Sequence, residues 1–253
     1  MLTQFLPDGI GAGVAALLVV ASFFTSALTA TFGLGGGIAM LALMGLFVPV
    51  AALIPVHGAV QLGSNSGRAW VQRAHVRRDI FLPFAIGSVI GATIGAFVVI
   101  QLPDAVMKLV LGLFILAITW TRIPGMERIG RAGLAAASVI LSVLSMLLGA
   151  TGPLLNAVLA QFMAGDRKAL VATHAATMTV QHFLKVVVFG IAGFAFASWL
   201  PLVAAMIASG YLGTIYGSKL LDRMPQQAFS FWFKVLISVL AIDLARRGLT
   251  AML

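Results

Sequence analysis

The feature that most constrains this chain is a series of apolar runs that follow one another from near residue 10 to near residue 245. A run of about 20 apolar residues spans the hydrocarbon core of a bilayer as a helix. Only 9% of the residues are charged, whereas a soluble domain carries about 25%. No stretch is left for a separate soluble domain. We therefore expect residues 1–253 to form one all-α, polytopic transmembrane domain.

The charge and cysteine content limit the partners of the chain. A net charge of +9 would suggest nucleic acid binding in a soluble protein. In a membrane protein, Lys and Arg collect in cytoplasmic loops, so we expect a lipid bilayer as partner and no nucleic acid. The chain has no cysteine, which excludes disulfides and thiolate metal sites. Residues 1–9 contain no Lys or Arg, so we expect the first apolar segment to stay in the mature protein.

Charged residues and Pro/Gly breaks divide the chain into ten apolar segments. These segments lie near residues 10–31, 37–53, 56–73, 80–100, 105–121, 132–149, 153–165, 169–190, 199–219 and 228–245. The second and the seventh are short and follow Gly-rich breaks. They are therefore predicted to be half-helices or arms of re-entrant hairpins.

The two halves of the chain resemble each other in order and spacing. Residues 33–37 (Gly-Leu-Gly-Gly-Gly) correspond to residues 149–153 (Gly-Ala-Thr-Gly-Pro), and a histidine follows each break, His57 in the first half and His174 in the second. Leu102-Pro103 recurs as Met224-Pro225 at an offset of 122. This shared order predicts a duplicated unit of about five segments, with repeat 1 near residues 10–121 and repeat 2 near residues 132–246.

The positive charges indicate how the two repeats are oriented. Basic residues cluster at Arg73, Arg77 and Arg78, at Arg122, Arg128 and Arg131, at Arg167 and Lys168, and at Lys219 and Arg223. The loops at residues 101–104 and 190–198 carry none. If the clusters are cytoplasmic, each half crosses the membrane an odd number of times, so the repeats are inverted. Arg246 and Arg247 are the exception, because this topology places them outside.

Two segments carry small residues at every fourth position. The series are Gly87, Gly91 and Gly95, and Ser209, Gly213 and Gly217, at an offset of 122. Such patterns let helix backbones approach closely in a membrane. We interpret them as packing surfaces, either between the two halves or between two protomers of a homodimer.

The two Gly-rich breaks are the first candidates for a binding site, because broken helices at equivalent positions of two repeats mark such sites in transporters. The N-terminus of a short helix presents unpaired N–H groups and a partial positive charge. Glycine permits close approach of the backbone to a ligand. The expected contact residues are Gly35, Gly36, Gly37, Thr151 and Gly152. The alternative interpretation is a tightly packed turn without a ligand.

The third and eighth segments each place a histidine and a cation eleven residues apart on one helical stripe. The first stripe consists of His57, Gln61, Ser64 and Arg68, with Asn65 beside it; the second consists of His174, Gln181 and Lys185, with His182 beside it. A single histidine of this kind is often a packing residue, and a basic residue near a helix end often extends toward water. The repetition favours a functional role.

The acidic residues sharpen this interpretation. Six of the seven acids fall in loops or at segment ends, and only Asp243 lies within a predicted helix, near its end. A buried charge needs a partner, and no carboxylate is available in mid-membrane for Arg68 or Lys185. Two cations and two helix N-termini favour an anion and argue against a cation pump. A divalent metal carrier using His57, His174 and His182 is the less favoured alternative.

Residues 33–37, Pro49, Arg77-Arg78-Asp79, the Gly91/Gly95 helix and Leu102-Pro103 follow one another in an order that resembles the TauE/SafE family of sulfite exporters. The second half is similar to the diverged second copy in that family. The resemblance implies a transporter of the bacterial inner membrane that carries sulfite, sulfonates or related organosulfur anions and is driven by an ion gradient. The second break lacks the glycine triplet, so we expect the two halves to contribute unequally.

The resulting hypothesis is a secondary transporter that works by alternating access and binds a small anion between the N-termini of the two short helices. Arg68 and Lys185 supply charge, and the expected hydrogen-bond donors are Gln61, Ser64, Asn65, Thr151 and Gln181. The candidates for proton coupling are His57, His174 and His182, because imidazole titrates near neutral pH. No catalytic residue, cofactor or resident metal is expected. An anion channel with the same site is the alternative, and an intramembrane enzyme is disfavoured because Ser64 and His57 are too far apart for a nucleophile–base pair.

Overall fold

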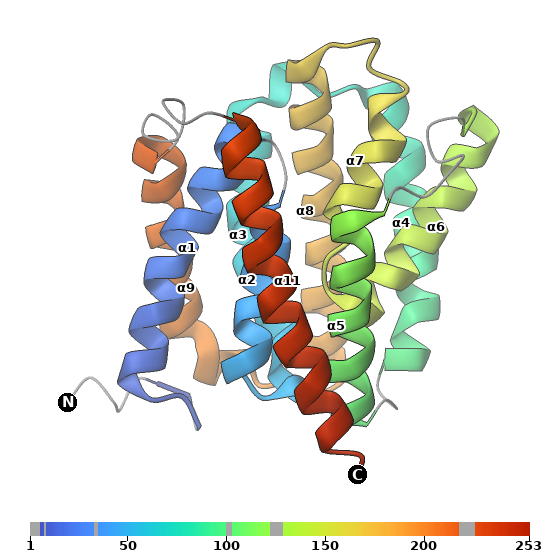
Figure 1. Ribbon diagram of the computed structural model, residues 1–253. Coiled ribbons are helices and arrows are strands. Elements are labelled where there is room, and N and C mark those ends of the chain that lie inside the picture. Colours follow the sequence, from blue (N-terminus) through green and yellow to red (C-terminus); the bar gives the residue numbers. More distant parts are fainter. Residues whose placement is uncertain (1–5, 8, 33–34, 100–102, 122–128, 218–225) are drawn as a thin grey trace. The chain divides into compact units, whose positions relative to one another are not determined.

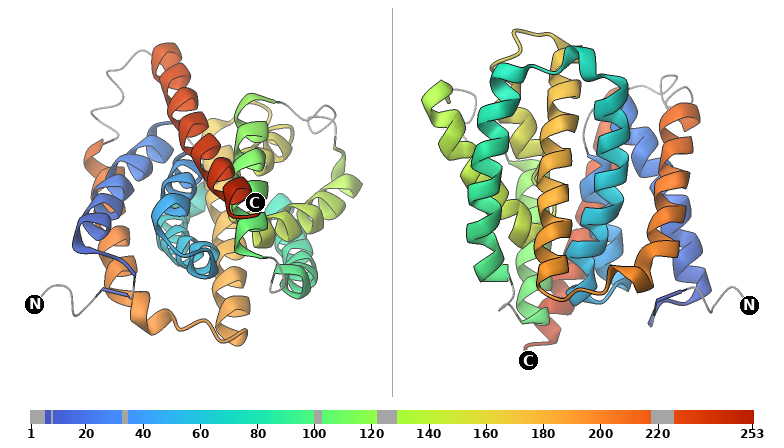
Figure 2. Two further views of the ribbon diagram at one scale, coloured as in Figure 1. Left: turned by 60° about the horizontal axis from the view of Figure 1, so that its bottom comes forward. Right: turned by 180° about the vertical axis from the view of Figure 1, so that it is seen from behind.

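The computed structural model describes residues 6–7, 9–32, 35–99, 103–121, 129–217 and 226–253. In these ranges the chain forms ten α-helices, one short 3₁₀ helix and one π-helical turn (Figures 1 and 2). The elements are α1 (Ala12–Phe32), α2 (Gly36–Phe47), α3 (Val50–Val71), η2 (Arg73–His75), α4 (Arg78–Val99), α5 (Asp104–Trp120), α6 (Arg131–Leu148), α7 (Gly152–Ala160), α8 (Arg167–Ile191), α9 (Phe196–Leu212), η4 (Gly213–Gly217) and α11 (Gln226–Thr250). The expected all-helical chain is confirmed.

Two of the predicted segments end earlier in the structure than expected. The second segment is predicted to reach residue 53, but α2 ends at Phe47 and α3 begins at Val50. The cause is Pro49, because the residue before a proline is driven out of the helical region, and Val48 is extended at φ −92° and ψ 134°. The seventh segment is predicted to reach residue 165, but α7 ends at Ala160.

Three described helices are long and apolar enough to cross a membrane. Within the described ranges the spans are Ala12–Ala30, Arg78–Phe97 and Phe196–Tyr216. Gly36–Phe47 and Gly133–Leu148 are apolar but shorter, as expected for α2. The π-helical turn η4 follows α9 directly and interrupts the regular spacing of Ser209, Gly213 and Gly217.

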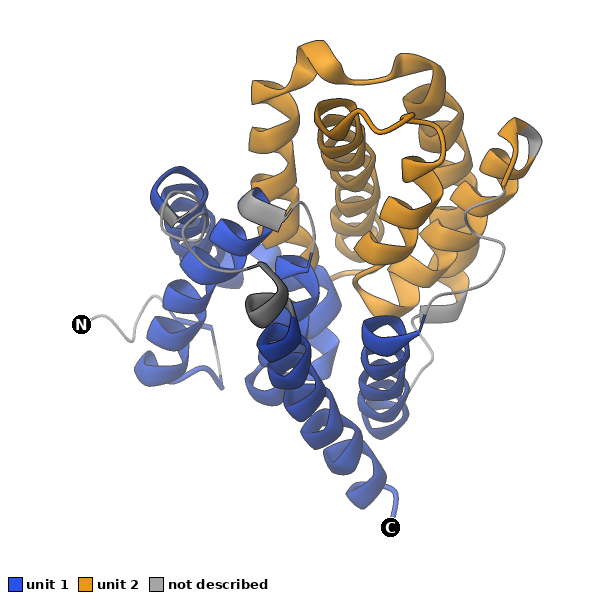
Figure 3. Ribbon diagram, turned by 45° about the horizontal axis from the view of Figure 1, so that its top comes forward, with its two compact units in different colours: residues 1–57, 102–122, 195–253 blue, residues 58–101, 123–194 orange. Residues whose placement is uncertain are grey.

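The chain divides into two compact units, shown in different colours in Figure 3. Unit 1 consists of residues 1–57, 102–122 and 195–253, and unit 2 consists of residues 58–101 and 123–194. Unit 1 therefore contains α1, α2, the first part of α3, α5, α9 and α11. Unit 2 contains the rest of α3 with η2, α4, α6, α7 and α8. Each unit takes helices from both halves of the sequence.

In unit 1, the contacts join α1 to α9 and α5 to α11. A Cβ on Gly213 would lie 2.0 Å from the Phe23 carbonyl oxygen, so no larger residue fits where the turn after α9 meets α1. On the other pair of helices, Gly112 lies against Ala241 and Gly248 lies against Ala105. The residue numbers rise on one helix as they fall on the other, so α5 and α11 run antiparallel.

In unit 2, α4 packs on α6 and α8 packs on α4 and α7 (Figure 2). A Cβ on Gly87 would lie 1.7 Å from Ser138 Oγ, and one on Gly91 would lie 2.3 Å from the Val139 carbonyl oxygen. The small residues of α4 and α9 are therefore packing surfaces between the two halves of the chain, as one of the two interpretations expects. Because these faces are covered within the chain, they give no support to the homodimer.

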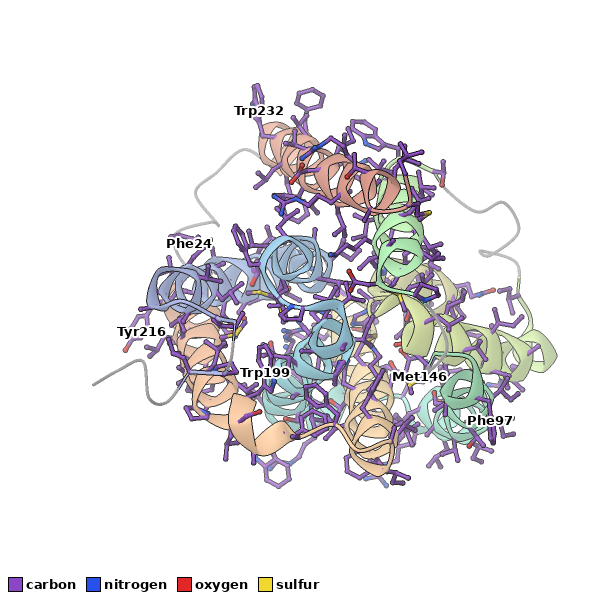
Figure 4. The ribbon with its side chains drawn as sticks, turned by 90° about the horizontal axis from the view of Figure 1, so that it is seen from below. Phe24, Phe97, Met146, Trp199, Tyr216 and Trp232 are labelled. Carbon is purple, nitrogen blue, oxygen red and sulfur yellow. The ribbon has the colours of Figure 1, made fainter. Side chains whose placement is uncertain are left out.

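The outer surface of both units is apolar. Phe24, Phe97, Tyr216 and Trp232 point away from the helices that carry them (Figure 4), and between 58% and 75% of each is exposed. Met146, by contrast, is buried between α6 and α4 beside Gly95. Exposed apolar surface of this extent marks contact with lipid or another apolar partner.

Candidate functional site

The two Gly-rich breaks separate α1 from α2 and α6 from α7. Gly35 precedes α2 at φ +101°, and Gly149 ends α6 at φ +79°, a left-handed conformation that glycine adopts without steric cost. A Cβ on Gly36 would lie 1.9 Å from the Thr25 carbonyl oxygen of α1, so this position also requires glycine. Gly33, Leu34, Leu102, Met224, Pro225, Arg122, Arg128, Lys219 and Arg223 lie outside the described residues.

A histidine holds the start of each short helix. In unit 1, His57 Nε2 lies 2.9 Å from the carbonyl oxygen of Gly37. In unit 2, His174 Nε2 lies 3.1 Å from the carbonyl oxygen of Gly152. A carbonyl only accepts, so Nε2 carries the hydrogen in both rings. The spacing found in the sequence therefore corresponds to the same contact in both halves.

Lys185 lies at the break between α6 and α7. Its side chain is fully buried, and its ammonium group donates a hydrogen bond to the carbonyl oxygen of Gly149, which follows the last residue of α6. The Nδ1 atom of His182 lies 3.4 Å away, and the alkyl chain packs on Gly58 of α3. The carbonyl end of a helix carries a partial negative charge, so the α6 terminus serves as a counter-charge in place of a carboxylate.

Beside the lysine, a chain of polar side chains crosses the same break. Gln181 Nε2 donates to Ser142 Oγ of α6 at 3.0 Å, and Thr151 Oγ1 donates to Gln181 Oε1 at 3.3 Å. All three residues are buried. The structure thus brings together Thr151, Gly152, Gln181 and Lys185 at the α6–α7 break of unit 2.

The polar side chains on one face of α3 form hydrogen bonds mainly with residues of the same helix. Arg68 donates to Ser64 Oγ at 3.3 Å and to Asn65 Oδ1 at 3.5 Å. Asn65 in turn donates to the carbonyl oxygen of Gln61 at 2.8 Å. Arg68 is only 8% exposed. It is therefore a buried cation of unit 2, rather than one that extends to water.

The predicted set divides between the units. Gly35, Gly36, Gly37 and His57 belong to unit 1, and Gln61, Ser64, Asn65, Arg68, Thr151, Gly152, His174, Gln181, His182 and Lys185 belong to unit 2. The break in unit 2 therefore has the larger cluster of predicted polar residues.

Two serines of α6 are missing from the predicted set. Ser142 is the hydrogen-bond partner of Gln181. Ser145 is 1% exposed, and its Oγ atom has no hydrogen-bond partner among the described residues. A signal for both exists in the sequence, because Ser138, Ser142 and Ser145 lie at i, i+4 and i+7 on α6, and Ser22, Ser26 and Thr29 repeat this spacing on α1.

Three described acids, Asp79, Asp104 and Asp166, lie at helix starts, and Asp243 lies inside α11. Asp79 pairs with Arg77 at 2.8 Å, and the Asp166 side chain accepts from the backbone N–H of Ala169 at the start of α8. Asp243 lies within 2.9 Å of both Arg246 and Arg247. These two arginines, which the predicted topology places outside, are therefore paired with a carboxylate. In the described part of the chain, no three His, Asp or Glu side chains come together as metal ligands.

Comparison with known proteins identifies the family. The family model described as sulfite exporter TauE/SafE matches residues 18–244. Neither a curated protein nor a solved structure matches significantly. The matched range runs from α1 to α11 and includes both breaks with their histidines and lysine. The chain therefore belongs to the TauE/SafE family, whose members are multi-pass membrane transporters of sulfite and organosulfur anions and not enzymes.

Proposed function

We propose that the protein is a secondary transporter that moves a small sulfur-containing anion by alternating access and binds it at the α6–α7 break of unit 2. The observation that carries this proposal is the fully buried ammonium group of Lys185, whose bonded partners are a carbonyl oxygen and a histidine nitrogen. Among the described residues no carboxylate pairs with this ammonium group, and the end of α6 offers only a partial negative charge. A bound anion would therefore supply the rest of the counter-charge.

The groups around Lys185 suit an oxyanion. The start of α7 at Gly152 supplies backbone N–H groups and the positive end of the helix dipole. The hydrogen bonds of Thr151 and Gln181 join the start of α7 to α8 and α8 to α6. Arg68 adds a second buried positive charge to the same unit, held by Ser64 and Asn65, with Gln61 one turn earlier. In this proposal Gly35, Gly36 and Gly37 form the corresponding but weaker element of unit 1.

We also propose that the two halves are inverted repeats. The fifth helix of each half, α5 and α11, pack on each other antiparallel, which is the relation that inverted copies require. The other pairings correspond as well. The first helix of repeat 1, α1, packs on the fourth helix of repeat 2, α9, just as α6 packs on α4. These contacts support two copies of one five-helix repeat, in which the fourth helix of each repeat packs on the first helix of the other.

Proton coupling through the histidines belongs to the same proposal. His57 and His174 hold the starts of the short helices through Nε2. His182 lies beside the Lys185 ammonium group, which makes it the histidine of the three that is best placed to exchange a proton with the site. The family assignment favours an ion-coupled carrier of the bacterial inner membrane. Saturation of flux with substrate distinguishes this carrier from an anion channel.

Binding to the detergent-purified protein tests the proposed function. Sulfite, sulfate, taurine, sulfoacetate and nickel are compared by thermal shift, because a ligand that binds only the folded state stabilises it by about 2.7 kcal/mol at 100 times its Kd. We expect a sulfur oxyanion to raise the Tm of the wild type and of Lys168→Ala, a control at an exposed lysine of the same helix. We expect no such rise in Lys185→Ala. An equal rise in Lys185→Ala, or stabilisation by nickel alone, would contradict the proposal.

A further inference from the structure

Ser145 of α6 is a buried hydroxyl without a hydrogen-bond partner in the described part of the chain. Its side chain is 1% exposed, and Oγ forms no hydrogen bond among the described residues. Most buried hydroxyls of membrane helices bond a carbonyl of their own helix, as Ser138 does with Ala135 at 2.7 Å. A buried polar group without a partner lowers stability, so such a group in a native protein needs an explanation.

The position of Ser145 places it at the break. The backbone N–H of Gly149 donates to the Ser145 carbonyl oxygen at 3.0 Å, so the two residues lie one helical turn apart on α6. The other carbonyl at this point, that of Gly149, holds the ammonium group of Lys185. Ser142, one turn earlier, holds Gln181. Ser145 thus lies in the last turn of α6, just before the Gly149 carbonyl group that binds Lys185.

Four acceptor atoms at the break each already receive a hydrogen bond from a described residue, whereas several donor hydrogens are left over. Gly149 accepts from Lys185, Gly152 from His174, Gln181 Oε1 from Thr151, and Ser142 Oγ from Gln181. The remaining hydrogens belong to the ammonium group, to the hydroxyls of Ser142 and Ser145, and to the backbone N–H groups of Gly152 and Leu154. Pro153 has no N–H, and the Leu155 N–H donates to the Thr151 carbonyl oxygen. A ligand bound here meets donors and a positive charge.

We infer that Ser145 is a direct ligand of the transported anion, and that the break selects a fully ionised sulfur oxyanion over hydrogen phosphate. The inference rests on the proposed function and adds to it a residue and a ligand class. A sulfate or sulfonate oxygen only accepts, so each oxygen can use a donor of the break. Hydrogen phosphate carries a hydroxyl that needs an acceptor. The acceptors left for it are oxygens that already receive a hydrogen bond and hydroxyls that also donate, and a polar site binds less tightly a ligand that leaves its groups mismatched.

The deciding variant is Ser145→Ala. Removal of an unpartnered buried hydroxyl leaves the Tm of the ligand-free protein unchanged or raised. The affinity for sulfate, measured by titration calorimetry, is expected to fall about tenfold, because a hydrogen bond to a charged ligand is lost. A purely structural serine would show the opposite pattern, a lower Tm with unchanged affinity.

Ser88→Ala is the matched control. Ser88 of α4 is also fully buried, and its Oγ atom also has no partner among the described residues. Its neighbour Gly87 packs on Ser138, which lies about three helical turns before Gly149. We expect Ser88→Ala to bind sulfate as the wild type does.

Wild-type protein gives a second readout that depends on no variant. At pH 7, sulfate is expected to bind at least about tenfold more tightly than phosphate. Unchanged sulfate affinity in Ser145→Ala, or equal binding of sulfate and phosphate, would overturn the inference and leave the proposed function standing. If no sulfur oxyanion binds the wild type, the proposed function fails first.

Discussion

The two Gly-rich breaks share a histidine contact and differ in almost everything around it. At both, a ring Nε2 holds a carbonyl in the first turn of a short helix, Gly37 in unit 1 and Gly152 in unit 2. At the α1–α2 break, Phe233 and Leu28 pack against Gly35. At the α6–α7 break, Lys185 caps the end of α6, and Thr151, Gln181 and Ser142 form a polar chain.

The histidine contact is therefore common to both breaks, whereas the surrounding side chains differ, and we expect these side chains to determine which break binds the anion. The glycine triplet, which is the more conspicuous motif in the sequence, belongs to the break where Phe233 and Leu28 pack against Gly35. Its Gly36 lies against the Thr25 backbone, so close helix packing explains it. The break without the triplet holds the buried charge and is the better candidate for binding.

The largest expected effect comes from removing the buried charge. Lys185→Met keeps the volume and removes the ammonium group, and we expect anion affinity to fall about 10- to 100-fold, since hydrogen bonds to charged groups contribute about 1.5–3 kcal/mol. Binding assays on the purified protein measure this fall. Lys168→Met, at an exposed position of the same helix, is expected to have no effect. Wild-type affinity in Lys185→Met would remove the distinction between the two breaks.

Glycine substitutions test, through the stability of the protein, whether the two breaks are packed differently. A Cβ on Gly36 would lie 1.9 Å from a backbone oxygen, whereas the nearest atom to a Cβ on Gly152 is His174 Nε2 at 3.7 Å. We therefore expect Gly36→Ala to cost about 1–3 kcal/mol of stability through overpacking, and Gly152→Ala to fold with nearly unchanged Tm. Thermal unfolding of the two variants in one detergent checks this. Equal destabilisation would show that both breaks are packed alike.

Replacing the histidines is expected to have a smaller effect, which separates a role in the structure of each break from a role in anion binding. His57→Ala and His174→Ala each leave a carbonyl without its donor, which costs about 1–3 kcal/mol when the group stays dry and less when water replaces the ring. We expect both to lower the Tm, but only His174→Ala to weaken anion binding, because only its break holds Lys185. If His57→Ala weakened binding as strongly, the two breaks would share the anion.

The fold was largely predictable because a bilayer allows few alternatives. Backbone groups in hydrocarbon must be bonded within the segment, so apolar runs become helices, and all ten appear. The end of α2 was not placed correctly, because Val48 and Pro49 are apolar and continue the run, although proline ends the helix. The sequence pattern also does not distinguish packing on another half from packing on another protomer.

The candidate site was predictable in its residues but not in its contacts. The stripe on α8 indicates that Gln181 and Lys185 face one way, and both are buried at one break. That Lys185 caps α6 depends on a contact 36 residues away in the chain, which no local spacing encodes. Ser145 was missed because serine is common in membrane helices and usually bonds its own backbone.

Selenate bound to crystals of the protein would locate the anion site, because its anomalous scattering marks the anion without any assumption about where it binds. We expect a peak within hydrogen-bonding distance of Lys185 Nζ and Ser145 Oγ, at the start of α7. That peak should weaken when sulfite competes. A peak at the α1–α2 break beside Gly36, or none near Lys185 at concentrations that stabilise the protein, would contradict the account.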